Sequence, residues 1–519
     1  MTVQVDKPAP LRIGVVIDSF FQPRWVRKSL ENALATNLCT MVLVAKVSSE
    51  KKSGGSLLYK FYERIDRRLF VSDALEPVNI ADLFEPALVK HGSEQINEAD
   101  LDLVINFASR ELNAKLASAA KHGVWFYSFG DAPGVNEVMN LVPITVSSLR
   151  ALKDGDEHVI YQSVSPTLSR FSVRLNNNSL YWKSASFVAR GLMNTCERQN
   201  VNHSSAVATK PGNAAMSKML LKLSGRAAGR AVEKLSTYEQ WVLAYRINQS
   251  EFKYLIPPND RFWADPFPVK AGGKYYIFFE EYLNSAGRAH LSVVEVDQNG
   301  ITGGPTEVLK LDCHLSYPFV FEWQGEWYMI PETGEKNVVE LYRAVEFPFK
   351  WKHEKVLLEA NRPLDATLIE VDGVWWMYVN VQEEGVAVNW DELHLYYADS
   401  PLGPWKPHAR NPVVSDVRSA RPAGRLFWSK NVLYRPSQDS SLRYGYGTTI
   451  SKVTKLSPSE YNETEVLKIV PDWDRDIIGV HTVNLLEEIT VIDCLTKRSR
   501  FRSSTLGPPK RSLDLPFVG

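Results

Sequence analysis

The chain has 519 residues with 60 basic and 60 acidic side chains, and 44% of its residues are hydrophobic. This length predicts two or more domains, and the balanced charge argues against a nucleic-acid partner. No apolar run reaches transmembrane length, and residues 1–10 lack a signal-peptide pattern. The four cysteines lie far apart, so we predict no metal site, no cofactor and no structural disulfide in a soluble cytoplasmic protein.

Residues 1–190 alternate the patterns of strands and helices. In chain order we expect a strand at 11–18, a helix at 25–34, strands at 40–47 and 102–107, a helix at 110–121, a strand at 123–129 and a hairpin over 143–164. Such alternation predicts a mostly parallel, Rossmann-type α/β domain. No glycine-rich fingerprint follows the first strand, so a dinucleotide site is not expected.

This order resembles the N-terminal domain of the methionyl-tRNA and amino-sugar N-formyltransferases, through 102–107, 123–128 and 146–162. The resemblance implies a catalytic asparagine and histidine two residues apart on the strand after Gly123, and an aspartate in the later turn. The first two positions hold Phe126 and Ser128, and Asp154 or Asp156 fills the third. Phenylalanine cannot stabilise an oxyanion, and serine is a poor general base without a partner. We therefore expect a degenerate domain that does not transfer formyl groups.

Residues 191–240 are predicted to form a linker and a basic amphipathic helix. Residues 200–215 have a linker composition, whereas 216–235 is helical in composition. Basic residues follow each other at four-residue spacing along this helix, at Lys218, Lys222, Arg226, Arg230 and Lys234. Such a face can lie on an anionic membrane. A solvated face on a helix packed between domains is the commoner arrangement.

Residues 241–500 repeat one aromatic hairpin five times, and 501–519 form a tail. The inner strands start 52, 48, 56 and 60 residues apart, at Asp265, Tyr317, Asp365, Arg421 and His481. A period near 50 with strands and no helices predicts an all-β five-bladed propeller. We expect 241–247 to close the ring as the outer strand of the last blade.

Hairpin geometry gathers polar side chains at one mouth of the predicted central channel. Residues equidistant from a turn lie opposite each other in an antiparallel pair. Counting from each turn pairs Asp265 with Glu280, Tyr317 with Glu332, Asp365 with Asn380, Arg421 with Gln438, and His481 with Cys494. Polar groups that converge on one concave mouth indicate a binding or catalytic pocket.

Several long motifs in this region resemble the N-terminal module of plant glucosamine inositolphosphorylceramide transferases, over about 240–460. They include 263–267, 316–321, 330–333, 421–424 and 435–439. The same motifs resemble bacterial proteins that fuse this module to a degenerate formyltransferase-like domain. The module is related to the five-bladed propellers of arabinanases, invertases and levansucrases.

The related propellers imply glycosidase-like chemistry, in which two carboxylates flank the anomeric carbon. Asp265 would be the nucleophile or base, Asp365 would stabilise the developing charge, and Glu332, or else Glu280, would be the acid/base. The expected substrate-binding residues are Glu280, Tyr317, Arg421, Arg435, Gln438 and Trp263. Each acid alone also fits plain turn chemistry, as Asp265 before a proline does. Their convergence favours function.

We therefore predict a glycosyl- or furanosyl-transferase that builds a bacterial surface glycan, with its site at the propeller mouth. Its partners would be a sugar donor and a glycan or lipid-linked acceptor, with possible peripheral membrane contact through 216–235. One alternative is a sugar N-formyltransferase that uses the propeller to bind its acceptor. Another is a non-catalytic glycan-binding or scaffold protein.

Overall fold

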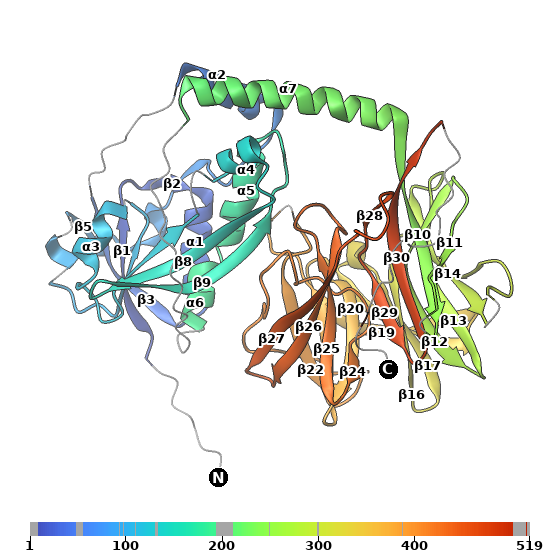
Figure 1. Ribbon diagram of the computed structural model, residues 1–519. Helices are drawn as coiled ribbons and strands as arrows, with labels where there is room; N and C mark the ends of the chain where they lie inside the picture. Colours follow the sequence, from blue (N-terminus) through green and yellow to red (C-terminus); the bar gives the residue numbers. More distant parts are fainter. Residues whose placement is uncertain are drawn as a thin grey trace, which may run out of the picture. The chain divides into compact units, whose positions relative to one another are not determined.

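The computed structural model describes residues 9–47, 56–92, 94–96, 98–108, 110–129, 133–193, 211–248, 250–297, 300–386, 388–501 and 515. The chain divides into two compact units. Unit 1 comprises 1–225 with 385–387, and unit 2 comprises 226–384 with 388–519. Figure 1 shows a mixed sheet with helices in unit 1 and a ring of sheets in unit 2.

Unit 1 contains a seven-stranded sheet in the order β5-β3-β1-β6-β7-β8-β9. The strands are β1 (Leu11–Ile17), β3 (Cys39–Lys46), β5 (Val89–His91), β6 (Leu103–Asn106), β7 (Val124–Ser128), β8 (Ile144–Lys153) and β9 (Asp156–Pro166). The first five are parallel to one another, and most apolar residues of β1, β6 and β7 are buried. The hairpin β8–β9 adds two antiparallel strands, so the sheet is mixed. A small pair, β2 (Phe21–Pro23) and β4 (Pro77–Asn79), lies apart from it.

The helices of unit 1 differ in burial, and α6 is buried on nearly all sides. They are α1 (Arg24–Ala35), α2 (Leu57–Leu69), α3 (Asn113–Leu116), α4 (Val135–Asn140), α5 (Val173–Ser184) and α6 (Phe187–Met193), with short 3-10 turns at 81–83, 86–88, 94–96 and 110–112. Trp25 of α1 and Phe187 of α6 join the main core over the sheet. Helix α7 (Asn213–Ser236) covers the segment predicted to be helical.

The positions that correspond to formyltransferase catalytic residues do not come together. Phe126 is buried in the middle of β7, opposite Arg150, and Ser128 pairs with Ser148. Asp154 lies in the β8–β9 turn, six residues along β8 from Ser148. Six strand residues span roughly 20 Å, so Ser128, which lies beside the middle of β8, is far from Asp154 in the turn. The expected trio is therefore not assembled in this unit.

Unit 2 is a five-bladed β-propeller, as the repeat predicts. Blade one consists of β12 (Arg261–Ala271), β13 (Lys274–Leu283), β14 (Arg288–Val296) and β15 (Thr306–Leu309), and blade two of β16 (Ser316–Trp323), β17 (Glu326–Glu332), β18 (Val338–Glu346) and β19 (Lys350–Glu359). Blade three consists of β20 (Leu364–Val371), β21 (Val374–Asn380), β22 (Leu393–Ala398) and β23 (Lys406–Pro407), and blade four of β24 (Phe427–Ser429), β25 (Val432–Asp439), β26 (Gly447–Leu456) and β27 (Tyr461–Ile469). Blade five consists of β28 (Ile477–Gly479), β29 (Val483–Leu486), β30 (Ile489–Ser499), β10 (Thr237–Ile247) and β11 (Lys253–Leu255).

The ring closes through strands from both ends of the unit. Strand β10 pairs with β30 along its whole length, from Thr237 opposite Ser499 to Ile247 opposite Ile489. The short strand β11 pairs with the far side of β10. The prediction that 241–247 forms the outermost strand is therefore off by one position, because β11 takes that place.

Candidate functional site

Three inner strands share the same distortion where they reach the mouth. Asp265, Tyr317 and Asp365 adopt positive φ angles of 50°, 44° and 56°. At each of them a β-bulge places two residues opposite one, so Glu280 pairs with Ala264, the residue before Asp265. Pairing by simple counting is therefore wrong by one residue in these blades. The bulge is a feature that no count from a turn can include.

Contacts between neighbouring blades confirm that the strand starts meet at one end of the channel. The backbone N–H of Tyr317 donates to Asp265 Oδ2 at 3.3 Å. His481 Nε2 lies 3.5 Å from Asp265 Oδ1. Arg421 binds Asp365 with two nitrogens, Nε and Nη2. The strand starts therefore form two linked groups. Asp265, Tyr317 and His481 join blades one, two and five, and Asp365 with Arg421 joins blades three and four.

Asp265, His481 and Asp493 form a buried charged trio. Thr482 Oγ1 donates to Asp265 Oδ1 at 2.7 Å, and His481 Nδ1 lies 2.6 Å from Asp493 Oδ2. Burial alone would lower the pKa of His481, but the carboxylates of Asp493 and Asp265 outweigh it and raise the pKa to about 9. Trp241 stacks on the imidazole with 4.1 Å between ring centroids. An imidazolium therefore sits between two carboxylates at neutral pH.

The same trio could hold a metal ion. One ligand atom from each of Asp265, His481 and Asp493 lies within 4.8 Å of the other two, and all three residues are buried. A cation would need His481 in its neutral form, because the imidazole must offer a lone pair. A proton on His481 and a metal ion would therefore compete for this place.

Asp365 is held by Arg421 and Gln438. Gln438 Nε2 donates to Asp365 Oδ2 at 3.1 Å, and the backbone N–H of Gln438 donates to the carbonyl of Arg421 at 2.8 Å. Burial raises the pKa of Asp365 to about 7, against the opposing effect of Arg421. The charges of Asp265 and Glu332 raise the pKa of Asp365 further.

Glu280 of blade one and Glu332 of blade two lie near His314, which is in the connection between these two blades. His314 Nε2 lies 3.3 Å from Glu280 Oε1. Burial raises the pKa of Glu280, and Glu280 with Glu332 helps to raise the pKa of His314 to about 9 although burial opposes it. Glu332 accepts hydrogen bonds from Ser316 Oγ at 2.7 Å and from the N–H of Gly334 at 3.1 Å. Glu332 and His314 keep partly exposed side chains, whereas Glu280 is buried.

Tyr317 crosses the channel instead of facing the mouth. Its hydroxyl accepts from the N–H of Gly424 at 2.8 Å and lies 2.8 Å from Thr367 Oγ1. The side chain is fully buried and packs edge-on against Phe267. The phenol therefore joins blades two, three and four, and has no free group for a substrate.

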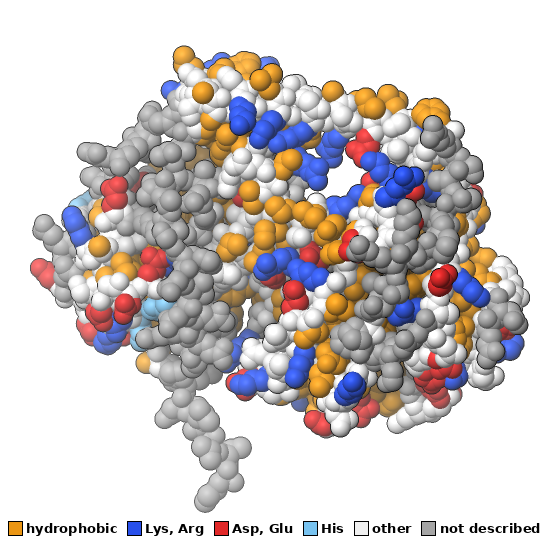
Figure 2. All heavy atoms as spheres, viewed as in Figure 1, with side chains coloured by type: hydrophobic (Ala, Val, Ile, Leu, Met, Phe, Trp, Pro, Cys, Tyr) orange, Lys and Arg blue, Asp and Glu red, His pale blue; other side chains and the backbone are white. Residues whose placement is uncertain are grey.

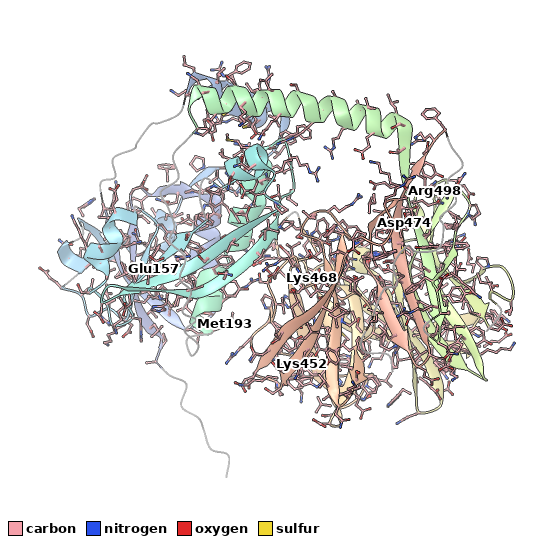
Figure 3. The ribbon with its side chains drawn as sticks, in the orientation of Figure 1. Glu157, Met193, Lys452, Lys468, Asp474 and Arg498 are labelled. Carbon is pink, nitrogen blue, oxygen red and sulfur yellow. The ribbon has the colours of Figure 1, made fainter. Side chains whose placement is uncertain are left out.

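Arg435 and Trp263 also stay outside the cluster. Arg435 is fully buried, and its guanidinium binds Glu463 and the carbonyl of Ser419 within blade four. Trp263 is buried and donates from Nε1 to Glu281 at 3.2 Å. Lys468 of β27, labelled in Figure 3, reaches across β26 to β25, where its Nζ lies 3.4 Å from Asp439 Oδ2. These side chains stabilise the blades and do not belong to the cluster at the mouth.

Four residues at the mouth were not identified from the sequence as part of the site. His314 contacts Glu280, and Asp493 contacts His481, although counting from the turn had placed Cys494 opposite His481. Tyr444 lies under Arg421, with the guanidinium 5.3 Å from the ring centroid, and Thr482 binds Asp265. Strand alternation does provide a signal for Asp493, because Cys494 faces the apolar core of blade five.

A second hollow, about 470 Å³, is lined by residues from the hairpin-turn half of the inner strands. Trp327, Trp375 and Trp428 contribute to its wall. Trp327 also stacks on Phe347, with 4.5 Å between ring centroids.

The comparisons with known proteins concern the propeller. Residues 247–476 match the family model described as glucosamine inositolphosphorylceramide transferase 1, N-terminal. Proteins named Glucosamine inositolphosphorylceramide transferase 1 from Oryza sativa subsp. japonica and Arabidopsis thaliana are each 40% identical, over 210 and 215 residues. These matches cover 40% and 41% of this chain but only 28% of either plant protein.

Among solved structures, Zg3597, a family 117 glycoside hydrolase from Zobellia galactanivorans, is 15% identical over 50% of this chain and 90% of its own, with a TM-score of 0.34. Apart from residues 385–387, which are grouped with unit 1, the family match lies within unit 2. None of these comparisons supports the resemblance of unit 1 to formyltransferases. The propeller of this chain is thus similar to a part of proteins named as transferases, and the chain spans 28% of their length.

Proposed function

We propose that this chain is a carbohydrate-active enzyme that transfers a sugar, and that its reaction takes place at the propeller mouth. The observation that carries the proposal is the convergence of Asp265, Asp365, Glu280 and Glu332 with His314, His481 and Arg421 at one end of the channel. The 40% identity of this region to proteins named as transferases supports it.

Glycosyl transfer needs one carboxyl group that can donate a proton and one carboxylate that can accept a proton or attack the anomeric carbon. Glu332 fits the proton donor best among the predicted acids, because its side chain is partly exposed. Glu280 with His314 is the second candidate, since burial already favours the protonated form of Glu280. Asp265 fits the ionised partner, because His481 faces it with positive charge.

Asp365 fits an indirect role in this proposal. Its carboxylate is fully engaged by Arg421 and Gln438. It would fix the guanidinium of Arg421 at the mouth, where a phosphate or carboxylate of a substrate could bind. Arg435, Tyr317 and Trp263 take no part in the proposed reaction, because they bind Glu463, Gly424 and Glu281, respectively.

The names of the plant relatives support a proposal for the acceptor of the sugar. The plant relatives are named for transfer to inositolphosphorylceramide, so we propose a lipid-linked acceptor for this chain as well. They lend no support to the finer prediction of a bacterial surface glycan. Among the described residues, no helix is both long and apolar enough to pass through a bilayer.

The test uses the full chain with detergent-solubilised inositolphosphorylceramide and, in turn, a panel of nucleotide-activated sugars. Mass spectrometry of the lipid would reveal a sugar adduct. We expect Glu332→Gln to lower the rate by about 10²–10⁴-fold, the range for loss of a general acid. Glu370→Gln, on an exposed residue of the hollow near the hairpin turns, is the matched control and should leave the rate unchanged. Equal rates in both variants would exclude Glu332 as the acid.

A non-catalytic glycan-binding protein remains the second candidate, favoured by the burial of the acids. Asp265 is 4% exposed and Asp365 is 1% exposed, and both are fully occupied by protein partners. Binding of inositol phosphate or a sugar to the mouth, measured calorimetrically, with no product from any donor would support this candidate over the enzyme. Loss of that binding in the Arg421→Lys variant would show that the ligand binds at the mouth, next to Arg421.

A further inference from the structure

Helix α2 exposes an apolar stripe to solvent. Four large hydrophobic residues follow each other at four-residue spacing and therefore lie along one face of the helix. These residues are Leu57, Phe61, Ile65 and Leu69, which are 78%, 58%, 41% and 70% exposed. Val71, directly after the helix, is 87% exposed. Contiguous exposed apolar surface of this kind is rare on soluble proteins and marks an interaction site.

The stripe is not needed to hold α2 in place, because another face does so. Tyr59 and Tyr62 are buried and cluster with Met216 and Met219 of α7. The Tyr62 hydroxyl donates to the carbonyl of Phe171 at 2.7 Å. These contacts also use up the apolar residues at the start of α7. The membrane surface that the sequence placed on 216–235 therefore lacks much of its apolar face there.

A row of basic residues runs directly beside the apolar stripe. Lys60, Arg64 and Arg68 each precede a stripe residue by one position and are themselves four residues apart. Like charges at this spacing destabilise a helix, and exposed leucine and phenylalanine gain nothing from water. Figure 2 shows hydrophobic side chains at the edge of the molecule where Figure 1 draws both α2 and α7. A surface that is both apolar and anionic would compensate for both features.

We propose that α2 is an interfacial helix that binds the surface of a lipid bilayer with anionic headgroups. Leu57, Phe61, Ile65 and Leu69 would enter the boundary of the acyl region, and the basic row would contact the headgroups. A second copy of the chain fits this face less well. A two-fold contact along the stripe would bring Lys60, Arg64 and Arg68 against the same charges of the partner. The proposal does not depend on the activity of the propeller.

The experiment measures flotation of the full chain with vesicles of phosphatidylcholine and of an equal mixture of phosphatidylcholine and phosphatidylglycerol. We expect binding to the mixed vesicles that weakens with salt. The triple variant Leu57→Ser, Phe61→Ser, Leu69→Ser should bind at least about tenfold more weakly. Arg64→Glu with Arg68→Glu should lose the preference for the anionic vesicles. All of these side chains are exposed, so the fold should persist, which melting curves would verify.

The matched control replaces three exposed apolar residues of unit 2, as Val345→Ser, Phe349→Ser and Leu442→Ser. It should bind vesicles as the unchanged chain does. Failure of the unchanged chain to float, or equal binding by the α2 triple variant and the control, would overturn the proposal. A concentration-dependent dimer in the absence of vesicles that the α2 triple variant abolishes would also overturn it, in favour of a second copy.

Discussion

The buried trio around His481 predicts a pH dependence of propeller stability. His481 is 2% exposed, and its pKa rises from the ordinary 6.5 to about 9. A group whose pKa is raised by folding contributes its full stabilisation below pH 6.5, and this contribution is lost as pH rises through 9. The difference between the two pKa values corresponds to about 3 kcal/mol. His314, with a pKa of about 9, adds a contribution of the same sign.

The free energy of unfolding should therefore fall between pH 6.5 and 9, with a slope of about 1.4 kcal/mol per pH unit for each proton involved. Urea unfolding, followed by tryptophan fluorescence at several pH values, measures this slope. Asp493→Asn removes the partner at 2.6 Å and should reduce the slope by about one proton. His408→Gln is the control, because burial lowers the pKa of His408 and its titration falls below this window. A flat profile in the unchanged chain, or an unchanged slope in Asp493→Asn, would refute the reasoning.

Three further predictions concern the ring itself, each measured as the change in free energy of unfolding. Tyr317→Phe leaves the N–H of Gly424 without its acceptor and should cost about 1–3 kcal/mol. Arg421→Met leaves Asp365 buried without its cation and should cost about 3–5 kcal/mol, with a smaller loss at pH values where Asp365 is protonated. Gly424→Ala should destabilise more than alanine at the exposed turn glycine Gly325, because a Cβ at Gly424 would collide with the carbonyl of Val483. Equal losses at the two glycines would contradict the crowding argument.

The five-bladed propeller could be predicted from the sequence because its repeat is long and its hairpins are rich in aromatic residues. The spacing from Asp265 to His481 gives five blades, and turn chemistry gives the ends of most inner strands. The exact pairing was not readable, since a bulge at Asp265, Tyr317 and Asp365 changes the register locally. The position of β10 was missed because the three-residue strand β11 is too short to produce a pattern.

The chemistry of the mouth was only partly accessible from the sequence. Counting identified which residues start the inner strands, but it could not tell a side chain that faces the mouth from one that crosses the channel. Tyr317 therefore looked like a binding residue, although its hydroxyl bonds with Gly424. The place of His314 in the site cannot be read from the sequence, because it depends on contact with Glu280. Glu280 lies on another segment of the chain, and only folding brings it near His314.

The burial of Asp265 changes what its substitution can reveal. Asparagine is nearly the same size as aspartate, so Asp265→Asn removes a charge with little change in volume. In the structure the carboxylate accepts from the N–H of Tyr317 and from Thr482, and it faces His481 at 3.5 Å. Asparagine tolerates the φ of 50°, but its amide must turn one N–H toward a donor. Stability should fall by about 1–3 kcal/mol even if Asp265 has no catalytic role. Glu332 is partly exposed and accepts hydrogen bonds from Ser316 and Gly334, so its substitution separates an effect on chemistry from an effect on folding more cleanly. A large loss of activity in Glu332→Gln at unchanged stability would mark the mouth as a working site, whereas matched losses of both would mark it as part of the frame.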